Sequence, residues 1–254
     1  MNAPLPLPAL DEIRAHEAGM VEIRSRTHQN PQLAYEEHAT SDLVAKRLAD
    51  WGWQVHRGLG GTGVVGTLRE GTSSRRIGLR ADMDALPIAE TSGKPWASRV
   101  FCKTHACGHD GHTAMLHNAP DEPEGQFAVL PGFAMASSDA CVAKVNGNGE
   151  IARAQAAVHG ATAEVDSMRR YPVLNNHAAE TAFCMNVIRD WLGEGALQPQ
   201  SEEKVPGCYV DIVNGSGAQG GCMVHNAADD FNDRVLSTGA TYRVRLAEAW
   251  LKPA

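Results

Sequence analysis

The stretch between residues 105 and 120, HACGHDGHTAMLHNAP, concentrates side chains that bind transition metals. It contains His105, Cys107, His109, His112 and His117, although the whole chain has only 11 His. Imidazole and thiolate groups suit zinc and related ions. A metal-dependent hydrolase also needs a carboxylate that takes a proton from water. The positions of the acids therefore decide which chemistry this stretch can support.

Cys107 and His109 are two residues apart, with a single glycine between them. Glycine lets the backbone turn sharply, so that both side chains can face one ion. Asp110 follows, and its carboxylate would be able to orient His109 through the second ring nitrogen. A structural zinc site built from Cys102, His105, Cys107 and His109 is an alternative, but these ligands are more crowded than the two separated pairs of usual closed sites. A polar surface turn without metal is the third interpretation.

A second candidate motif, GLRADMDALP, covers residues 78–87. An apolar strand ends there in Asp82 and Asp84, and this i, i+2 spacing puts both acids on one face of a strand. Ligands of open α/β sheets commonly bind at the carboxyl ends of strands. We therefore expect the two acids and the His-Cys stretch to share one site.

Composition limits the class of protein. With 254 residues, of which 43% are hydrophobic and 21% charged, the chain fits one large globular domain or two small ones. The net charge of −7 argues against nucleic acid and anionic membranes as partners. Six Cys are too few for a disulfide scaffold. The N-terminal sequence lacks the basic and apolar regions of a secretory signal, so we expect a cytoplasmic protein.

Hydrophobic periodicity and turn residues predict alternating helices and strands. This alternation favours an α/β fold, a layered sheet with helices on both faces. Helices are predicted at residues 9–26, 41–51, 151–159, 178–193 and 237–251, and strands at 62–68, 75–81, 126–130, 161–167 and 207–215.

Three motifs, GLRADMDALPIAET, HACGHDGHTAML and MVHNAADDFND, occur in an order that resembles the M20 metallopeptidase family. The closest branch contains the hippurate and auxin-conjugate amidohydrolases. The resemblance implies a catalytic α/β domain with two divalent ions and an inserted lid domain that serves dimerisation. It also implies hydrolysis of the amide bond of N-acyl amino acids. The catalytic domain would then comprise residues 1–140 and 172–254, and residues 141–171 would be a remnant of the lid.

The same resemblance assigns roles to individual residues. By their place in the motifs, Cys107 and His109 match two metal ligands, and His225 matches a ligand near the C-terminus. His117, in LHNAP, resembles a further ligand. Asp84 matches a catalytic acid that lies beside the metals. The implied cofactor is one or two divalent ions, zinc or manganese.

The chain lacks a segment that the family carries between its HTAML-like and LHNWP-like motifs. In the family, a PAEEG-like motif in that segment supplies the general-base glutamate and a metal ligand. The lid is shortened as well, which leaves little surface for a standard dimer interface of about 1,600 Å². The resemblance therefore implies an impaired amidohydrolase for small N-acyl amino acids, either a monomer or a weak homodimer. The alternative is a non-catalytic, metal-binding remnant of the family.

Overall fold

The computed structural model describes residues 11–70, 75–116, 125–131, 176–197 and 222–251, together with 153, 155–157, 162, 208, 210–212 and 214–215. Contacts divide the chain into two units. The first comprises Met1–Phe133, Cys184–Gln198 and Val210–Ala254, and the second comprises Ala134–Phe183 and Pro199–Tyr209. The sheet and the described candidate residues belong to the first unit. The assignment of 1–140, 141–171 and 172–254 to catalytic and lid domains stays a prediction.

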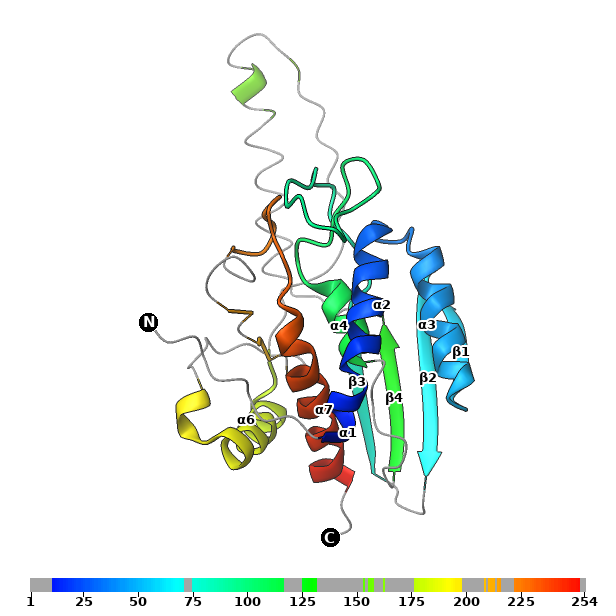
Figure 1. The fold of residues 1–254 in the computed structure, drawn as a ribbon, viewed down its shortest axis with the longest axis vertical. Coiled ribbons are helices and arrows are strands. Elements are labelled where there is room, and N and C mark those ends of the chain that lie inside the picture. Colours follow the sequence, from blue (N-terminus) through cyan, green and yellow to red (C-terminus); the bar gives the residue numbers. More distant parts are fainter. Residues whose placement is uncertain are drawn as a thin grey trace. The chain divides into compact units, whose positions relative to one another are not determined.

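The first unit contains a four-stranded sheet in the order β1-β2-β4-β3 (Figure 1). β4 pairs antiparallel with β2 and parallel with β3, so a strand that comes late in the sequence separates two earlier ones. The predicted α/β class is confirmed. The strands are β1, Gln54–Leu59; β2, Gly63–Glu70; β3, Arg76–Ala81; and β4, Gly125–Pro131.

β1 lies in a segment that the sequence patterns did not mark as a strand. All its side chains are exposed except that of Val55, which is partly buried. The strand is held by antiparallel pairing to β2, and its register slips between Arg57 and Leu59. Gly58, at φ +85°, lies at this irregularity and adopts a backbone conformation that other residues avoid. One partly buried side chain gives too little alternation for a strand to be recognised.

Two helices occupy the region where one was predicted at 9–26. They are α1, Asp11–Ala15, and α2, Glu17–Gln29, with His16 between them. α3 runs from His38 to Asp50 and therefore begins before the predicted start at Ser41. Gly52, at φ +80°, follows α3 and turns the chain toward β1.

The other described helices are α4, His109–Leu116; α6, Ala178–Leu192; and α7, Leu236–Leu251, with short 3₁₀ turns η1, Glu194–Ala196, and η2, Asp233–Val235. The helices predicted at 178–193 and 237–251 are confirmed as α6 and α7. The guanidinium of Arg245 on α7 lies 5.4 Å from the ring centroid of Trp191 on α6, within cation–π range.

The strand predicted at 207–215 is wrong for the residues that the structure describes there, because 208, 210–212 and 214–215 are not in a strand. Asn214 pairs instead with Asn232. The Asn232 backbone N–H donates to Asn214 Oδ1, and Asn232 Nδ2 donates to the Asn214 carbonyl, each at 2.9 Å. Residues 153 and 155–157 of the predicted helix 151–159 are helical, whereas the strand at 161–167 lies almost wholly outside the described residues. Within the described chain, every helix falls short of the length and apolarity needed to span a bilayer.

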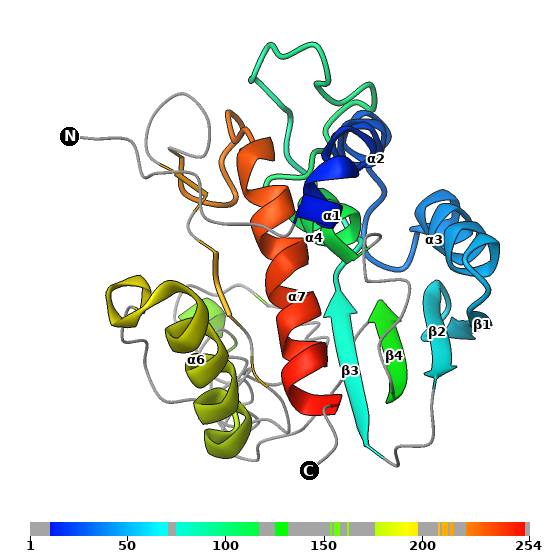
Figure 2. The same ribbon diagram turned by 60° about the horizontal axis from the view of Figure 1, so that its bottom comes forward.

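α4 is packed between two hydrophobic clusters. One cluster joins α3, the sheet, α4 and α7, and the other joins α1, α2, α4 and α7. Figure 2 shows α4 and α7 beside β3, and α3 beside β2 and β1. Leu116 of α4 contributes to the first cluster, whereas Ala114 and Met115 contribute to the second. The helix that begins at His109 is therefore held by core packing along its length.

Glycine permits the closest of these contacts. A Cβ added at Gly111 on α4 would lie 2.3 Å from two carbon atoms of the Phe231 ring. A Cβ at Gly239 on α7 would lie 2.3 Å from the sulfur of Met115. Both separations are far inside van der Waals contact, so α4 approaches its neighbours closely only because these two side chains are absent.

Candidate metal site

The two acids at the end of β3 both reach the first residue of α4. β3 ends at Ala81, and Asp82 and Asp84 follow on one face of the extended chain. Asp84 Oδ1 lies 3.0 Å from His109 Nδ1, and Asp82 Oδ2 lies 4.0 Å from His109 Nε2. Thr113 Oγ1 donates to the Asp82 carbonyl at 3.0 Å and ties α4 to this turn. The acids and the His-Cys stretch thus share one site, as the sequence predicted.

His109 is oriented by the backbone and the side chain of a single residue. Its Nδ1 lies 2.9 Å from the Asp84 carbonyl and 3.0 Å from Asp84 Oδ1. Both oxygens are acceptors, so Nδ1 carries the proton, and Nε2 faces Asp82. Metal-binding histidines commonly donate one ring N–H to a carboxylate or carbonyl while the other nitrogen holds the ion. His109 has this arrangement.

The charge state of His109 follows from its neighbours. Burial alone lowers the pKa of His109, but the hydrogen bond to Asp84 and the contact with the Cys107 thiol raise this pKa to about 11. The pKa of Asp84 is lowered, because the bond to His109 outweighs the opposing effect of burial. The metal-free site therefore holds an imidazolium between carboxylates, and a divalent cation would replace its Nε2 proton.

His112 lies one helical turn after His109. The two ring centroids are 5.4 Å apart. Burial lowers the pKa of His112 to about 3, and the positive charges on His109 and Arg243 act in the same direction. The Arg243 guanidinium donates to the His112 carbonyl at 2.9 Å. His112 is consequently neutral and has a free electron pair for a metal.

Among the residues that the structure describes, Asp82, His109 and His112 form the one group of three donors whose ligand atoms all lie within 4.8 Å of one another. All three are partly exposed, so an ion can reach them. Donors around a tetrahedral zinc ion stand about 3.3 Å apart, as bonds of about 2.0–2.2 Å require. The donor types fit a divalent metal, and the 4.0 Å between His109 Nε2 and Asp82 Oδ2 is wider than the donor spacing around a bound zinc ion.

The metal ligands suggested by the motifs differ in how close the structure brings them to this three-donor group. Cys107 is partly exposed and contacts His109, but it lies outside the three-donor group. The His225 backbone N–H donates to the Ala106 carbonyl at 2.5 Å, which brings its segment against the Cys107 loop. His225 has φ +66° and an exposed side chain. His117 lies outside the described residues.

The alternative structural zinc site is not formed, because Cys102, His105, Cys107 and His109 do not make a donor group among the described residues. Cys102 is exposed, whereas His105 is 2% exposed. Burial lowers the pKa of His105 to about 4. The five cysteines in the described part of the chain form no disulfide.

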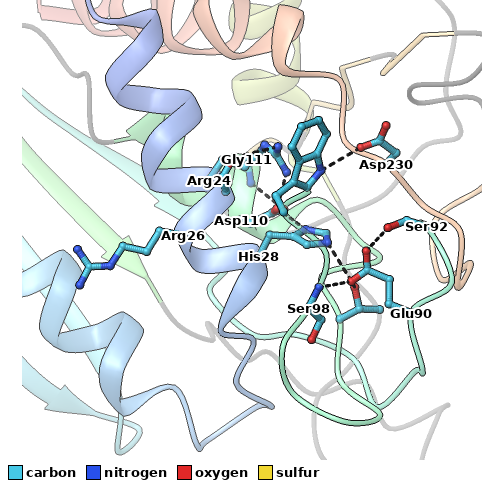
Figure 3. Close-up of polar contacts among 12 residues, drawn as sticks. Arg24, Arg26, His28, Glu90, Ser92, Ser98, Asp110, Gly111 and Asp230 are labelled. Atoms are coloured by element: carbon cyan, nitrogen blue, oxygen red, sulfur yellow. Dashed lines mark hydrogen bonds and ion pairs between the residues drawn. The ribbon is translucent and has the colours of Figure 1, made fainter. Parts of the chain in front are cut away.

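Asp110 does not orient His109, contrary to the sequence-based expectation. Its carboxylate is fully buried and turns toward α2, where it accepts from His28 Nδ1 at 2.9 Å and from Arg24 Nη1 at 3.4 Å (Figure 3). These positive groups hold the pKa of Asp110 well below its usual range, against the effect of burial. Asp110, which follows His109 in sequence, therefore bonds to buried residues of α2, and Asp84 is the acid that bonds to the His109 imidazole.

Asp82 and His112 were not predicted as donors from the sequence, although two signals pointed to them. The i, i+3 spacing of His109 and His112 puts both imidazoles on one face of a helix. Asp82 shares its strand face with Asp84, which the motifs did single out. Attention to the helical register of the His-rich stretch would have joined these residues.

Comparison with known proteins adds an independent line of evidence. The family described as peptidase family M20/M25/M40 matches residues 78–119, which contain both acids and the His-Cys stretch. The hippurate hydrolase of Campylobacter jejuni is 50% identical over 94 residues, which cover 37% of this chain and 24% of that protein. The IAA-amino acid hydrolase ILR1-like 5 of Arabidopsis thaliana is 47% identical over 100 residues, which cover 39% of this chain and 23% of that protein.

One solved structure shares the fold over nearly the whole chain. The Bacillus subtilis YXEP protein, titled a dinuclear metal binding peptidase from M20 family, has a TM-score of 0.69 at 18% identity, with 95% of this chain and 99% of that chain covered. The aligned part of the present chain spans only about a quarter of the length of the two curated relatives described above.

Proposed function

We propose that this chain is a metal-dependent amidohydrolase with impaired hydrolysis, because residues 78–119 match the M20/M25/M40 peptidase family and its relatives include amidohydrolases. Its substrates would be small N-acyl amino acids, the class that the names of its relatives indicate. The observation that carries the proposal is the Asp82, His109 and His112 group, in which Asp84 orients His109. The donors lie within the segment that matches the family.

In this proposal the metal is held by His109 through Nε2, with Asp82 and His112 beside it. The family resemblance adds Cys107, His225 and His117 as further ligands. A divalent ion supplies Lewis acidity toward an amide carbonyl oxygen. Asp84 keeps the His109 ring in place and its Nδ1 protonated. Histidine with thiolate favours zinc, whereas a carboxylate-rich set favours manganese, and one ion is proposed because the family's bridging glutamate is missing.

The proposed impairment rests on the general base. Losing a positioned base lowers a hydrolysis rate by about 10²- to 10⁴-fold. Among the described acids, Asp229 has a pKa suited to that role, since burial and the neighbouring charge of Asp110 raise its pKa to about 6. Asp229 is 8% exposed and follows the His225 segment. The variant Asp229→Asn therefore tests whether any remaining activity depends on this carboxylate.

The second candidate function is metal binding without catalysis. The missing glutamate motif favours it, because the family's general base belongs to that motif. This alternative predicts a bound ion and no hydrolysis that depends on the ion. We also propose a cytoplasmic location and a monomer or weak homodimer, in line with the lack of disulfides among the described cysteines and with the shortened lid.

The test combines metal content and hydrolysis on the same purified samples. N-benzoylglycine and N-acetyl amino acids are supplied with zinc or manganese to the wild type, His109→Ala, Asp229→Asn and the control His56→Ala. His56 is exposed on β1, away from the donors. We expect bound metal in all variants except His109→Ala, and turnover below the common range of about 1–10³ s⁻¹.

The outcomes separate the interpretations. Metal-dependent turnover within the common range, abolished in His109→Ala and kept in His56→Ala, would contradict the proposed impairment. Bound metal with no hydrolysis above the His109→Ala background would favour the non-catalytic alternative. A wild-type protein that binds neither zinc nor manganese would refute both functions.

A further inference from the structure

A chain of buried charged groups ends at the residue next to His109. Asp110, 0% exposed, accepts from the Nδ1 of His28, which is 1% exposed. The Nε2 of His28 lies 3.3 Å from Glu90 Oε2 on the far side of the ring. Figure 3 shows the His28 imidazole between the two carboxylates. A single side chain of α2 thus joins the start of α4 to the 88–104 loop.

The two ends of this chain are anchored differently. Glu90 also accepts from the Ser98 backbone N–H at 2.7 Å and from Thr104 Oγ1 at 3.0 Å, so its position is fixed by its own loop. Asp110 accepts from the Gly111 backbone N–H at 2.9 Å, and its other partners, Arg24 and His28, both belong to α2. The position of Asp110 therefore depends on α2, whereas that of Glu90 does not.

Asp110 is also the covalent neighbour of His109 in the first turn of α4. If the backbone of this turn follows a displaced Asp110 carboxylate, the His109 ring moves relative to Asp84. A misplacement of about 0.5 Å is enough to weaken a metal or catalytic site. The bonds that hold Asp110 are therefore bonds that hold His109, although none of them touches the imidazole.

We propose that His28 is a positioning residue for His109, acting through its Nδ1 bond to Asp110 and not through its contact with Glu90. The proposal concerns the same site as the proposed metal-dependent function and rests on it for its biological meaning. Its structural content stands in the metal-free protein, because the hydrogen bonds involved need no ion.

The two nitrogens of His28 can be replaced one at a time. The amide nitrogen of asparagine is as many bonds from Cβ as imidazole Nδ1, and that of glutamine as many as Nε2. His28→Asn therefore keeps a donor toward Asp110, whereas His28→Gln keeps one toward Glu90. Asp110→Asn removes the charge of the acceptor and leaves the His28 side chain itself unchanged. Glu90→Gln is the matched control at the Nε2 side of the His28 ring.

The first readout is the pair of ¹⁵N resonances of the His109 ring in metal-free protein, which report the Nδ1–H bond to Asp84. We expect His28→Asn and Glu90→Gln to leave these resonances at their wild-type positions, and His28→Gln and Asp110→Asn to shift them. If His28 served stability alone, its substitution would lower the melting temperature, but the His109 resonances would not differ between His28→Asn and His28→Gln. Unchanged His109 resonances in both His28→Gln and Asp110→Asn would overturn the proposal, and so would equal shifts in the two His28 variants.

The second readout is Co²⁺ affinity, followed by the visible absorption of the bound ion. His28→Gln should bind Co²⁺ about tenfold more weakly than His28→Asn, a loss typical of groups that support a metal ligand from behind. Equal affinities of the two variants would count against the proposal. If the wild type binds no Co²⁺, the proposed metal function fails, and the resonances of metal-free His109 still decide whether His28 positions it.

Discussion

Replacement of Arg24 by glutamine would remove a fully buried positive charge from the interior. Arg24 is 0% exposed on α2 and bonds to Asp110 at 3.4 Å and to Asp233 at 3.2 Å. Its guanidinium also lies 5.2 Å from the ring centroid of Trp96. Removing one partner of a buried ion pair costs about 3–5 kcal/mol, because the other charge is left without compensation in a medium that solvates it poorly.

The structure narrows this range. Asp110 keeps His28 and the Gly111 backbone N–H after the substitution, so its charge is not abandoned. Asp233 is partly exposed and can be solvated. We therefore expect a loss near the lower limit, about 3 kcal/mol. With an m-value of about 2–3 kcal/mol/M, the urea midpoint should fall by about 1–1.5 M.

The assay is equilibrium unfolding in urea, with Arg26→Gln as the matched control. Arg26 lies on the same helix but is exposed, and Figure 3 shows it pointing away from the network. Its substitution should change the free energy of unfolding by no more than about 0.5 kcal/mol. A loss below about 1 kcal/mol for Arg24→Gln would refute the reasoning. If that variant does not fold, Arg24→Lys, which keeps the charge but not the fork of donors, should fold with an intermediate loss.

Three further predictions concern packing, pH and metal. Gly111→Ala should destabilise the protein by about 1–3 kcal/mol, because the added carbon meets an aromatic ring at 2.3 Å. Gly19→Ala on α2, where nothing lies within 4 Å of the added carbon, should stabilise it by up to about 1 kcal/mol. Urea midpoints of the two variants that move in the same direction would contradict this prediction. Burial lowers the pKa of His28, but the neighbouring carboxylates raise it above 6.5 overall, so its contribution is present below about pH 6.5 and lost as pH rises through the folded-state pKa. The difference in free energy of unfolding between wild type and His28→Gln should therefore become smaller above that pH. A difference that grows with pH would contradict a raised pKa of His28 in the folded state. Zinc or manganese at about 100 times its Kd should stabilise wild type and His56→Ala by about 2.7 kcal/mol but leave His109→Ala unchanged, as thermal unfolding would reveal.

The amphipathic and apolar elements could be predicted from the sequence. α3, α6 and α7 have buried side chains at regular spacing, and the sequences of β2, β3 and β4 contain short apolar runs; these patterns identified them. β1 escaped because it has a single partly buried side chain and depends on its partner strand. The strand predicted at 207–215 shows the opposite error for the residues described there, since Asn214 bonds to the backbone and the side chain of Asn232 instead of joining a ladder.

The site was predictable in its location but less so in its bonding. The spacing of Asp82 and Asp84 after a strand correctly placed them beside His109. The predicted partner of Asp110 was wrong. Sequence proximity suggested His109, but the Asp110 carboxylate bonds to the buried His28 and Arg24 of α2, which are far away along the chain. Partners that come from distant segments depend on tertiary packing, which local patterns do not encode.

The strand order has a consequence for how the chain acquires its fold. β3 runs antiparallel to β2, and only residues 71–75 connect them, so the two can pair as a local hairpin as soon as they are synthesised. In the final sheet β4 lies between them. A premature hairpin must therefore open by about one strand spacing, from about 5 Å to about 10 Å, before β4 can enter. Local closure is fast, whereas pairing across a long loop is slow. In this topology the local β2–β3 hairpin thus competes kinetically with the pairing of both strands to β4. The native pairing can be completed only after β4, which ends at Pro131, has been synthesised.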